Sequence, residues 1–482
     1  MGWPVNTMAH QPESLRSIPS VDEILAHPQF QAWREAHPRF PWTPLVRSLL
    51  VSVRDDVRSA RVVGSDRSDL VERTVAAARE RVEWLSSGGL KPVLNGTGVV
   101  LHTNLGRAPV GTRAANAALA ALEGYSSLEV DLLSGERSKR GEVLEAMVCA
   151  LTGAEAAMVV NNNAAAVYLL VNSLSPPGRV VVSRGELVEI GGSFRLPEIL
   201  RHAAREVVEV GTTNRTYAAD YENEARAGDL LLKVHKSNYE IEGFAHETSV
   251  AELVAVARAK ACHVAFDLGS GALFDFAEHG LGHDPVASVV IESGVDAVTM
   301  SGDKLLGGVQ AGIIAGRQSL VERLKQNPLR RAVRIDKVAV AALQEVLRAY
   351  LFSDRLTDDV PVIAAVSEGY ETCRSRAEGV AARVADAVAP RWGIRAVADE
   401  AAVGGGSLAG AVVPSAAVAA RCRDDAEAVR VARELRTRAL PVFVRVRDDE
   451  IRVNMTTIFP NQEEPLIAAL VDVLRAAQLA RP

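Results

Sequence analysis

The sequence predicts an α/β protein whose large domain is built on a mostly parallel sheet of seven strands. Between about residues 155 and 316, short apolar runs alternate with helical stretches such as Thr248–Ala259. Strands that are apolar throughout belong to sheets buried on both faces, and helical crossovers favour parallel neighbours. The predicted strands are Ala157–Val160, Val180–Ser183, Glu206–Val210, Leu230–His235, Val264–Asp267, Ala297–Ser301 and Gly312–Ala315.

Two smaller parts flank this sheet. The N-terminal part reads as short helices broken by prolines. After about residue 335 the pattern changes to helical segments, a glycine run at 404–406 that we interpret as a turn, and two alternating strands, Val442–Val446 and Glu450–Met455. A terminal helix is expected from about Glu463. We therefore expect an N-terminal helical segment (1–75), a large domain (76–335) and a smaller C-terminal α+β domain (336–482).

Composition limits the class of protein. The chain has 482 residues and a net charge of −6, so it is not a strongly basic nucleic-acid binder as a whole. Its four cysteines are scattered without a Cys-x-x-Cys pair, which argues against a disulfide scaffold or a zinc site. No export signal and no apolar run long enough to span a bilayer is present, so a cytoplasmic protein without a membrane partner is expected.

The most informative residues are a lysine and an aspartate at strand ends. Lys304 follows the strand 297–301 within Ser-Gly-Asp-Lys-Leu-Leu-Gly-Gly, and Asp267 closes an earlier strand. Because ligands collect at the carboxyl ends of parallel strands, these two side chains are expected in one site. A lysine amine that forms a Schiff base and an acid that keeps a pyridine nitrogen protonated suit pyridoxal phosphate.

Other polar residues at the same edge complete a candidate cofactor site. Asn161, Asn162 and Asn163 pass from a strand into a helix of small residues, and such a junction presents free N–H groups to a phosphate. Simple N-capping by an asparagine is the alternative interpretation. Ser301 offers a further hydroxyl to the phosphate, and His235 also stands at a strand end.

The lysine motif also has less specific interpretations. Ser-x-x-Lys also occurs in penicillin-binding enzymes, but no Ser-Asp-Asn or Lys-Thr-Gly element accompanies it here. A single lysine near a loop is most often a surface charge. The paired Asp267 and the neighbouring glycines, which let backbone approach a ligand, favour the catalytic interpretation.

Several motifs together resemble those of bacterial selenocysteine synthase, the L-seryl-tRNA(Sec) selenium transferase family. The resemblance spans nearly the whole chain. The matching stretches are Leu15–Asp22, Asn95–Arg107, Tyr125–Asp131, Gly135–Arg137, Ser183–Gly191, Glu209–Arg215, His235–Tyr239 and Ser301–Gly308. Val309 and Ala409 depart from prolines that are usual or frequent in the family, which puts local loop geometry in doubt more than the chemistry.

The resemblance implies a fold-type-I pyridoxal-phosphate enzyme that acts on serine esterified to tRNA(Sec). In this family serine's amine displaces the lysine, here Lys304, and loss of the β-hydroxyl gives a cofactor-bound aminoacrylate. Selenium from selenophosphate then adds to the β-carbon. The resemblance also implies a homo-oligomer, dimer-based and forming a larger ring, and an N-terminal segment (1–75) that binds tRNA.

The resemblance further suggests roles for four charged residues. Arg107, Arg331 and Arg334 are expected to bind the anionic selenium donor, since guanidinium groups suit phosphate-like oxyanions. Asp303, next to the Schiff-base lysine, is expected to assist departure of the hydroxyl. Surface charge on a helix is the alternative for the 330–334 cluster.

Two other functions remain as alternatives. A related lyase with the same cofactor would act on a free small substrate such as a phosphorylated amino sugar acid. Such relatives lack much of the N-terminal helical segment, so residues 1–75 favour the tRNA-dependent enzyme. A tRNA-binding protein that has lost catalysis is disfavoured, because Lys304 and Asp267 are both retained.

Overall fold

The chain forms two compact units, Met1–Pro92 and Val93–Pro482. The computed structural model describes residues 17–59, 61, 66–174, 178–190, 194–239, 241, 243–282 and 284–479. Within these ranges, no helix is long and apolar enough to cross a membrane.

The first unit is helical. Its helices are α2 (Val21–Ala26), α3 (Pro28–Ala36), α4 (Trp42–Arg58) and α5 (Arg67–Ser87). Apolar residues recurring along one face of each helix form a small core, in which the rings of Phe30 and Trp42 lie 5.7 Å apart. Residue 75, the expected end of this segment, falls inside α5, and the unit continues to Pro92.

The large domain of the second unit contains the seven-stranded sheet, in the order β2-β10-β9-β8-β7-β3-β6. Only β10 runs antiparallel to its neighbours; the other pairings are parallel. All seven predicted strands are confirmed, with ends shifted by two residues at most. The strands are β2 (Ala156–Val160), β3 (Arg179–Ser183), β6 (Glu206–Val210), β7 (Leu230–Val234), β8 (His263–Gly269), β9 (Ala297–Ser301) and β10 (Gly312–Gly316).

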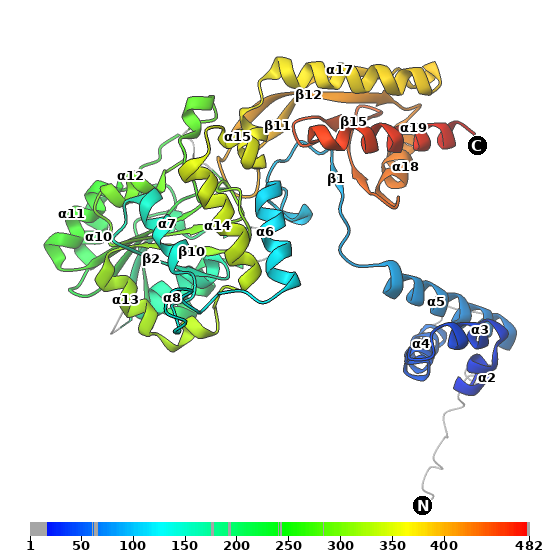
Figure 1. The fold of residues 1–482 in the computed structure, drawn as a ribbon, viewed down its shortest axis with the longest axis horizontal. Helices are drawn as coiled ribbons and strands as arrows, with labels where there is room; N and C mark the ends of the chain where they lie inside the picture. The colour runs from blue at the N-terminus through cyan, green and yellow to red at the C-terminus, as the bar shows by residue number, and fades with distance from the viewer. Residues whose placement is uncertain are drawn as a thin grey trace, which may run out of the picture. The chain divides into compact units, whose positions relative to one another are not determined.

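Helices cover both faces of this sheet (Figure 1). Because successive strand residues point to opposite faces, Leu231 packs in one core while Leu230 and Leu232 pack in the other. One core includes residues of α6 (Thr112–Glu123), α7 (Glu142–Thr152), α10 (Ala218–Glu224), α11 (Val250–Lys260), α12 (Ala287–Glu292) and α14 (Lys337–Phe352). The other includes residues of α8 (Asn163–Leu174), α9 (Leu196–Ala203) and α13 (Gln318–Gln326).

The smaller domain is an antiparallel sheet in the order β11-β12-β15-β14 with helices packed on it. The predicted hairpin is present: Asp448 and Asp449 both have positive φ, as a two-residue type I′ turn requires. The strands are β11 (Arg395–Ala402), β12 (Val412–Arg421), β13 (Val442–Phe443), β14 (Arg445–Arg447) and β15 (Glu450–Asn454). Its helices are α17 (Tyr370–Ala387), α18 (Asp425–Arg436) and α19 (Glu463–Leu479), whereas α15 (Leu356–Asp359) and α16 (Pro361–Ser367) pack on the core of the large domain.

The domain differs from the sequence prediction in two respects. Strand β11 lies where a helical segment was expected, β12 follows the glycine run where no strand was predicted, and the predicted strand 442–446 is divided into β13 and β14. The terminal helix begins at Glu463, as predicted.

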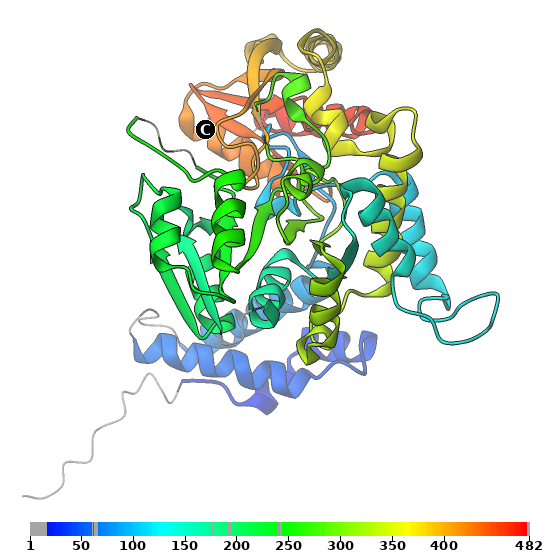
Figure 2. The same cartoon turned by 90° about the vertical axis from the view of Figure 1, so that its left-hand side faces the viewer.

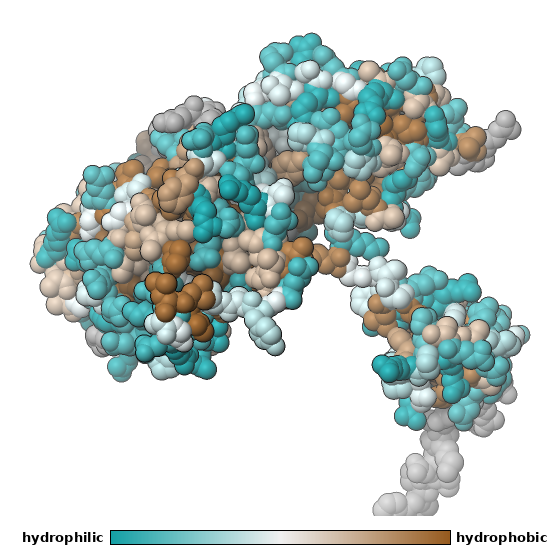
Figure 3. All heavy atoms as spheres, viewed as in Figure 1, coloured by the Kyte–Doolittle hydropathy of each residue, from teal (hydrophilic) through white to brown (hydrophobic). Residues whose placement is uncertain are grey.

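The surface visible in Figure 3 is largely hydrophilic with scattered hydrophobic side chains.

The segment that follows the first unit connects the large and the smaller domain of the second unit. Strand β1 (Leu94–Asn95) pairs with β13, Gly96 N donates to Phe443 O at 2.8 Å, and Leu101 N donates to Val403 O at 2.8 Å. These backbone bonds attach the start of the Asn95–Arg107 motif to the smaller domain. Remaining short elements are β4 (Glu189–Ile190), β5 (Phe194–Arg195), η1 (Thr103–Leu105), η2 (Arg184–Glu186), η3 (Phe276–His279), η4 (Pro328–Arg331), η5 (Pro390–Trp392) and η6 (Pro460–Gln462).

Candidate functional site

Lys304 lies at the carboxyl edge of the large sheet, three residues after β9 ends. Its side chain is buried, with 4% of the residue exposed, and Nζ lies 3.5 Å from the carbonyl oxygen of Gly406. Burial lowers the pKa of the Lys304 amine below its usual value, and the Asp267 carboxylate opposes that shift. A buried lysine with a lowered pKa is more often neutral, which is the form that attacks an aldehyde.

Asp267 lies on the adjacent strand β8 and is also buried. Its Oδ1 accepts hydrogen bonds from Asn163 Nδ2 and Thr299 Oγ1, both at 2.8 Å. Burial raises the pKa of Asp267 above its usual value, although both hydrogen bonds act in the opposite direction. The carboxylate is therefore fixed in place and would be stabilised in its ionised form by a nearby cation.

The three asparagines differ in their surroundings. Asn162 Oδ1 accepts from Ala165 N at 2.8 Å and so caps the start of α8, whereas Asn163 supports Asp267 and Asn161 is exposed. N-capping, the alternative interpretation of this junction, thus applies to Asn162. Ser301 is buried at the end of β9 and lies across β10 from Val160, because both pair with Gly312.

Asp303 and Arg107 form an ion pair beside the lysine. Arg107 Nη1 lies 2.9 Å from Asp303 Oδ2, and Ala108 N donates to Asp303 O at 3.3 Å. Arg107 has a φ of +63°, a left-handed conformation that is strained for an arginine. The motif that starts on the smaller domain is therefore anchored at its other end to the lysine loop.

A buried carboxylate that sequence reasoning missed connects three segments here. Asp284 lies 3.5 Å from His235 Nε2, accepts from Leu408 N at 3.2 Å, and is hydrogen-bonded by Ser270 Oγ. His235, predicted as a cofactor contact, also donates its backbone N–H to Asp267 O at 2.9 Å. Asp284 stands in a loop without a recognisable motif, so only the fold brings it to this edge.

The glycine loop of the smaller domain also reaches the site. Gly404, Gly405 and Gly406 all have positive φ, and a Cβ on Gly405 would lie 2.7 Å from Leu101 Cβ. This close approach brings Gly406 O to Lys304 and Leu408 N to Asp284. The run was predicted as a turn, and its unusual glycine density was the signal of a close backbone approach.

The site contains buried hydroxyls without hydrogen-bond partners among the described residues. Ser237 and Ser407 are 1% and 2% exposed, and their Oγ atoms are both unsatisfied. A Cβ built on Gly269 would lie 3.9 Å from Ser237 Oγ and 4.0 Å from Lys304 Nζ, so Ser237 is near the lysine. Such groups are rare in native interiors and indicate a missing partner.

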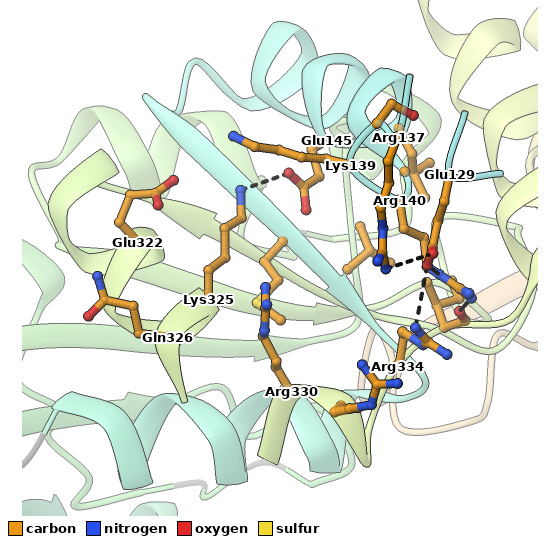
Figure 4. A pocket seen from close by; sticks show the side chains of 17 residues that line it. Glu129, Arg137, Lys139, Arg140, Glu145, Glu322, Lys325, Gln326, Arg330 and Arg334 are labelled. Carbon is orange, nitrogen blue, oxygen red and sulfur yellow. Dashed lines mark hydrogen bonds and ion pairs between the residues drawn. The ribbon is translucent and has the colours of Figure 1, made fainter. Parts of the chain in front are cut away.

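Arg331 and Arg334 lie in a different place, a basic cavity of about 520 Å³ beside β2 and α13 (Figure 4). Glu129 organises part of its wall: Arg140 Nε lies 2.9 Å, Arg137 Nη2 3.3 Å and Arg334 Nη1 3.4 Å from its carboxylate oxygens. Hydrogen bonding by Arg140 lowers the pKa of Glu129. The remaining polar lining residues are Ser138, Lys139, Glu145, Glu322, Lys325, Gln326, Arg330 and Arg331.

The predicted donor-binding arginines are therefore not all brought together within one chain. Arg107 lines a separate, smaller cavity of about 120 Å³ with His102 and Asn95. In contrast, Lys304, Asp267, Asp303 and His235 are brought together at one edge of the sheet by the contacts described above.

Comparison with known proteins identifies the family. Residues 93–459 match the family model described as L-seryl-tRNA selenium transferase, and residues 15–54 match one described as selenocysteine synthase N terminal. An L-seryl-tRNA(Sec) selenium transferase of Moorella thermoacetica is 41% identical over 464 residues, covering 96% of this chain and 97% of that protein. One of Rhizobium meliloti (strain 1021) is 40% identical over 455 residues, covering 94% and 96%.

Among solved structures, a D-glucosaminate-6-phosphate ammonia-lyase shares the fold, with a TM-score of 0.56 and 18% identity over 82% of this chain and 98% of that chain. The predicted fold class, fold-type-I with a large mostly parallel sheet and a smaller α+β domain, is thus confirmed. On the sequence matches, this chain belongs to the L-seryl-tRNA selenium transferase family.

Proposed function

We propose that this protein converts L-seryl-tRNA(Sec) to L-selenocysteinyl-tRNA(Sec), using pyridoxal phosphate held on Lys304 and selenophosphate as selenium donor. The observation that carries the proposal is the buried amine of Lys304, whose pKa burial lowers, beside Asp267 in a chain that matches the transferase family from residue 93 to 459. The proposed compartment is the cytoplasm, where aminoacyl-tRNA is made.

The residues at this edge fit the cofactor. Lys304 supplies the amine, and Asp267 supplies a carboxylate fixed by Asn163 and Thr299. The start of α8 supplies free N–H groups for a phosphate, with Asn161, Asn162 and Ser301 as proposed neighbours. The unsatisfied hydroxyl of Ser237 near Lys304 is a further group that lacks a partner.

Each residue has a proposed task. Pyridoxal phosphate, when bound, supplies an electron sink for the charge that develops at the α-carbon of serine. Lys304 would hold it through the side-chain amine until the amine of the substrate takes that place, and Asp267 would hold a proton at the ring nitrogen. Asp303, oriented by Arg107, is the proposed residue that assists departure of the serine hydroxyl.

The direct test is incubation of the cofactor-loaded protein with seryl-tRNA(Sec), with and without selenophosphate. Mass analysis of the amino acid released from the tRNA should give selenocysteine only when the donor is present. Recovery of unchanged serine in both samples would contradict the proposal.

Single replacement of Arg107, Arg331 or Arg334 by alanine should weaken use of the selenium donor. Loss of one charged hydrogen bond costs about 1.5–3 kcal/mol, roughly ten- to a hundredfold in the donor-dependent step. Elimination of the serine β-hydroxyl precedes attack by the donor, so this step should survive in the Arg331 and Arg334 variants. Separate single-turnover assays of elimination and of selenium incorporation measure the two steps.

The matched control is Arg374→Ala, an exposed arginine paired only with Glu378 among the described residues, which should change neither step. Equal loss of both steps in the Arg331 and Arg334 variants would indicate a structural or tRNA-binding role. Because Arg107 also holds Asp303, its variant should lose some elimination as well.

The first unit is proposed to recognise tRNA, supported by the family match over residues 15–54 and by its own compact core. Deleting residues 1–92 removes the whole first unit, so that the deletion does not end inside α5. It should weaken binding of seryl-tRNA(Sec) by about tenfold or more, the scale of one or two lost charged contacts. Cofactor attachment to Lys304 should be unchanged. Filter binding at fixed salt measures the affinity, because phosphate contacts depend on salt; equal affinity would contradict the role.

A homo-oligomer, dimer-based and extended to a ring in the manner of the family, is also proposed; light scattering would measure its size. Its support is a loop between α6 and α7 that projects from the domain, cyan in Figure 2, and that carries large exposed apolar side chains. Tyr125 and Leu133 are almost fully exposed and Leu132 is 79% exposed. Exposed apolar groups of this kind mark interaction surfaces. A second copy would also offer a way to bring Arg331 and Arg334 to a site containing Arg107.

A further inference from the structure

Ser407 carries a buried hydroxyl that the proposed function does not yet use. The residue is 2% exposed, and its Oγ has no hydrogen-bond partner in the described part of the chain. A hydroxyl removed from water without a replacement partner destabilises the folded state, so native proteins rarely keep one without a reason.

The position of Ser407 is fixed by its two neighbours. Gly406 O lies 3.5 Å from Lys304 Nζ, and Leu408 N donates to Asp284 at 3.2 Å. Leu408 has a φ of +48°, a left-handed conformation that other contacts must stabilise. Ser407 therefore stands between two direct contacts with the site, on a loop that belongs to the smaller domain.

The charges around this loop indicate which substrate group it would meet. Residues 404–408 are Gly-Gly-Gly-Ser-Leu and contain no cation. Arg107, a cation close enough to lower the Lys304 pKa, is already paired with Asp303. A free α-carboxylate buried against residues 404–408 would meet no cation in that loop. An ester carbonyl is uncharged and needs only a hydrogen-bond donor such as a hydroxyl.

We propose that Ser407 Oγ donates a hydrogen bond to the carbonyl oxygen of the aminoacyl ester, and so helps the site accept an esterified serine rather than the free amino acid. The inference rests on the proposed function. If the substrate amine stood where Lys304 Nζ lies, its ester carbonyl carbon would be two bonds and its carbonyl oxygen three bonds from that nitrogen, within reach of a residue adjacent to Gly406.

The test is Ser407→Ala in the cofactor-loaded full-length protein. Loss of one uncharged hydrogen bond should slow single-turnover elimination from saturating seryl-tRNA(Sec) by roughly three- to tenfold. Affinity for the tRNA, measured by filter binding, should be unchanged. The melting temperature should stay equal or rise, because the substitution removes an unsatisfied polar group. Ser407→Thr, which keeps the hydroxyl, should restore most of the rate.

Ser415→Ala is the matched control. Ser415 is another fully buried serine of the smaller domain, but its hydroxyl is bonded to Asn454 Oδ1 at 3.0 Å and Thr456 Oγ1 at 2.7 Å. This variant should lose thermal stability. A large excess of free L-serine should not slow elimination in the wild-type protein, since residues 404–408 offer its carboxylate no cation.

Two results would overturn the inference: a Ser407→Ala rate equal to wild type, or a rate loss accompanied by the same fall in melting temperature as Ser415→Ala. Effective competition by free L-serine would overturn the selection for an ester. A wild-type protein that carries the cofactor but leaves seryl-tRNA(Sec) intact would instead contradict the proposed function itself.

Discussion

Replacing Lys304 with alanine should abolish covalent attachment of pyridoxal phosphate and remove selenium transfer. Loss of a proton-transferring group alone costs about 10²–10⁴-fold in rate, and loss of the attachment point adds to it. Reduction with borohydride followed by peptide mass mapping should locate the cofactor on Lys304 in the wild-type protein and nowhere in the variant. The visible absorbance of the bound cofactor should disappear in parallel.

Lys236→Ala is the matched control. Its side chain is also nearly buried, 11% exposed, but it pairs with Glu247 rather than lying beside Asp267. This variant should keep the adduct on Lys304. An adduct that persists in Lys304→Ala on Lys236 or another lysine would show that the assignment is wrong.

The stability of Lys304→Ala separates a chemical role of the lysine from a structural one. Because burial lowers the pKa of Lys304, the folded chain binds this proton less tightly than the unfolded chain does. Burial of the amine therefore reduces stability most at pH values below the folded pKa, and this effect declines as the pH rises from the folded pKa and is gone above the unfolded pKa. Lys304→Ala should consequently not lower the melting temperature of the cofactor-free protein at neutral pH.

The large domain was predictable because its strands are apolar on both sides. Runs such as Val180–Ser183 are apolar throughout, so they are expected only in a sheet that is buried on both faces. Their predicted ends agree with the structure within two residues. Strand β11 was missed for the opposite reason. Its sequence, Arg-Ala-Val-Ala-Asp-Glu-Ala-Ala, is rich in helix formers and is half exposed, so pairing with β12 decides its conformation.

The candidate site shows the same division. Lys304 and Asp267 stand at or just after the carboxyl ends of strands, where parallel sheets bind their ligands, so the sequence pattern alone indicates them. Asp284 lies in a loop of the large domain, where it meets His235, and Ser407 lies in a loop of the smaller domain whose Gly406 and Leu408 contact Lys304 and Asp284 only because the two domains fold against each other. A single sequence carries no signal for such long-range contacts. The side chain of Asn163 was assigned to a phosphate, whereas in the structure it bonds to Asp267, since strand order places the two together.

Asp267→Asn should leave the cofactor attached but slow the reaction by about 10²–10³-fold, the range for loss of one preorganised electrostatic partner. Asparagine has nearly the same shape, and its oxygen can still accept from Asn163 and Thr299, so the pocket should remain intact. It carries no negative charge, however, and so cannot hold a proton on the ring nitrogen. The measurement is single-turnover elimination from seryl-tRNA(Sec), with the absorbance of the loaded protein recorded beside it.

The electrostatics of Asp267 make this a sharp test. Burial raises its pKa in the cofactor-free chain, so a buried carboxylate here is costly unless a cation faces it. A protonated ring nitrogen would be that cation, and the folded protein should gain stability when the cofactor binds wild type but gain less in Asp267→Asn.

Asp296→Asn is the control: Asp296 is also buried but lies at the opposite end of β9, bonded to Val264 N at 2.8 Å and paired with Arg317. That variant should lose thermal stability while keeping its rate per loaded site. A near-normal rate in Asp267→Asn, or an equal loss in both variants, would exclude the ring-nitrogen role, because only a partner of the reacting group should separate rate from stability in this way.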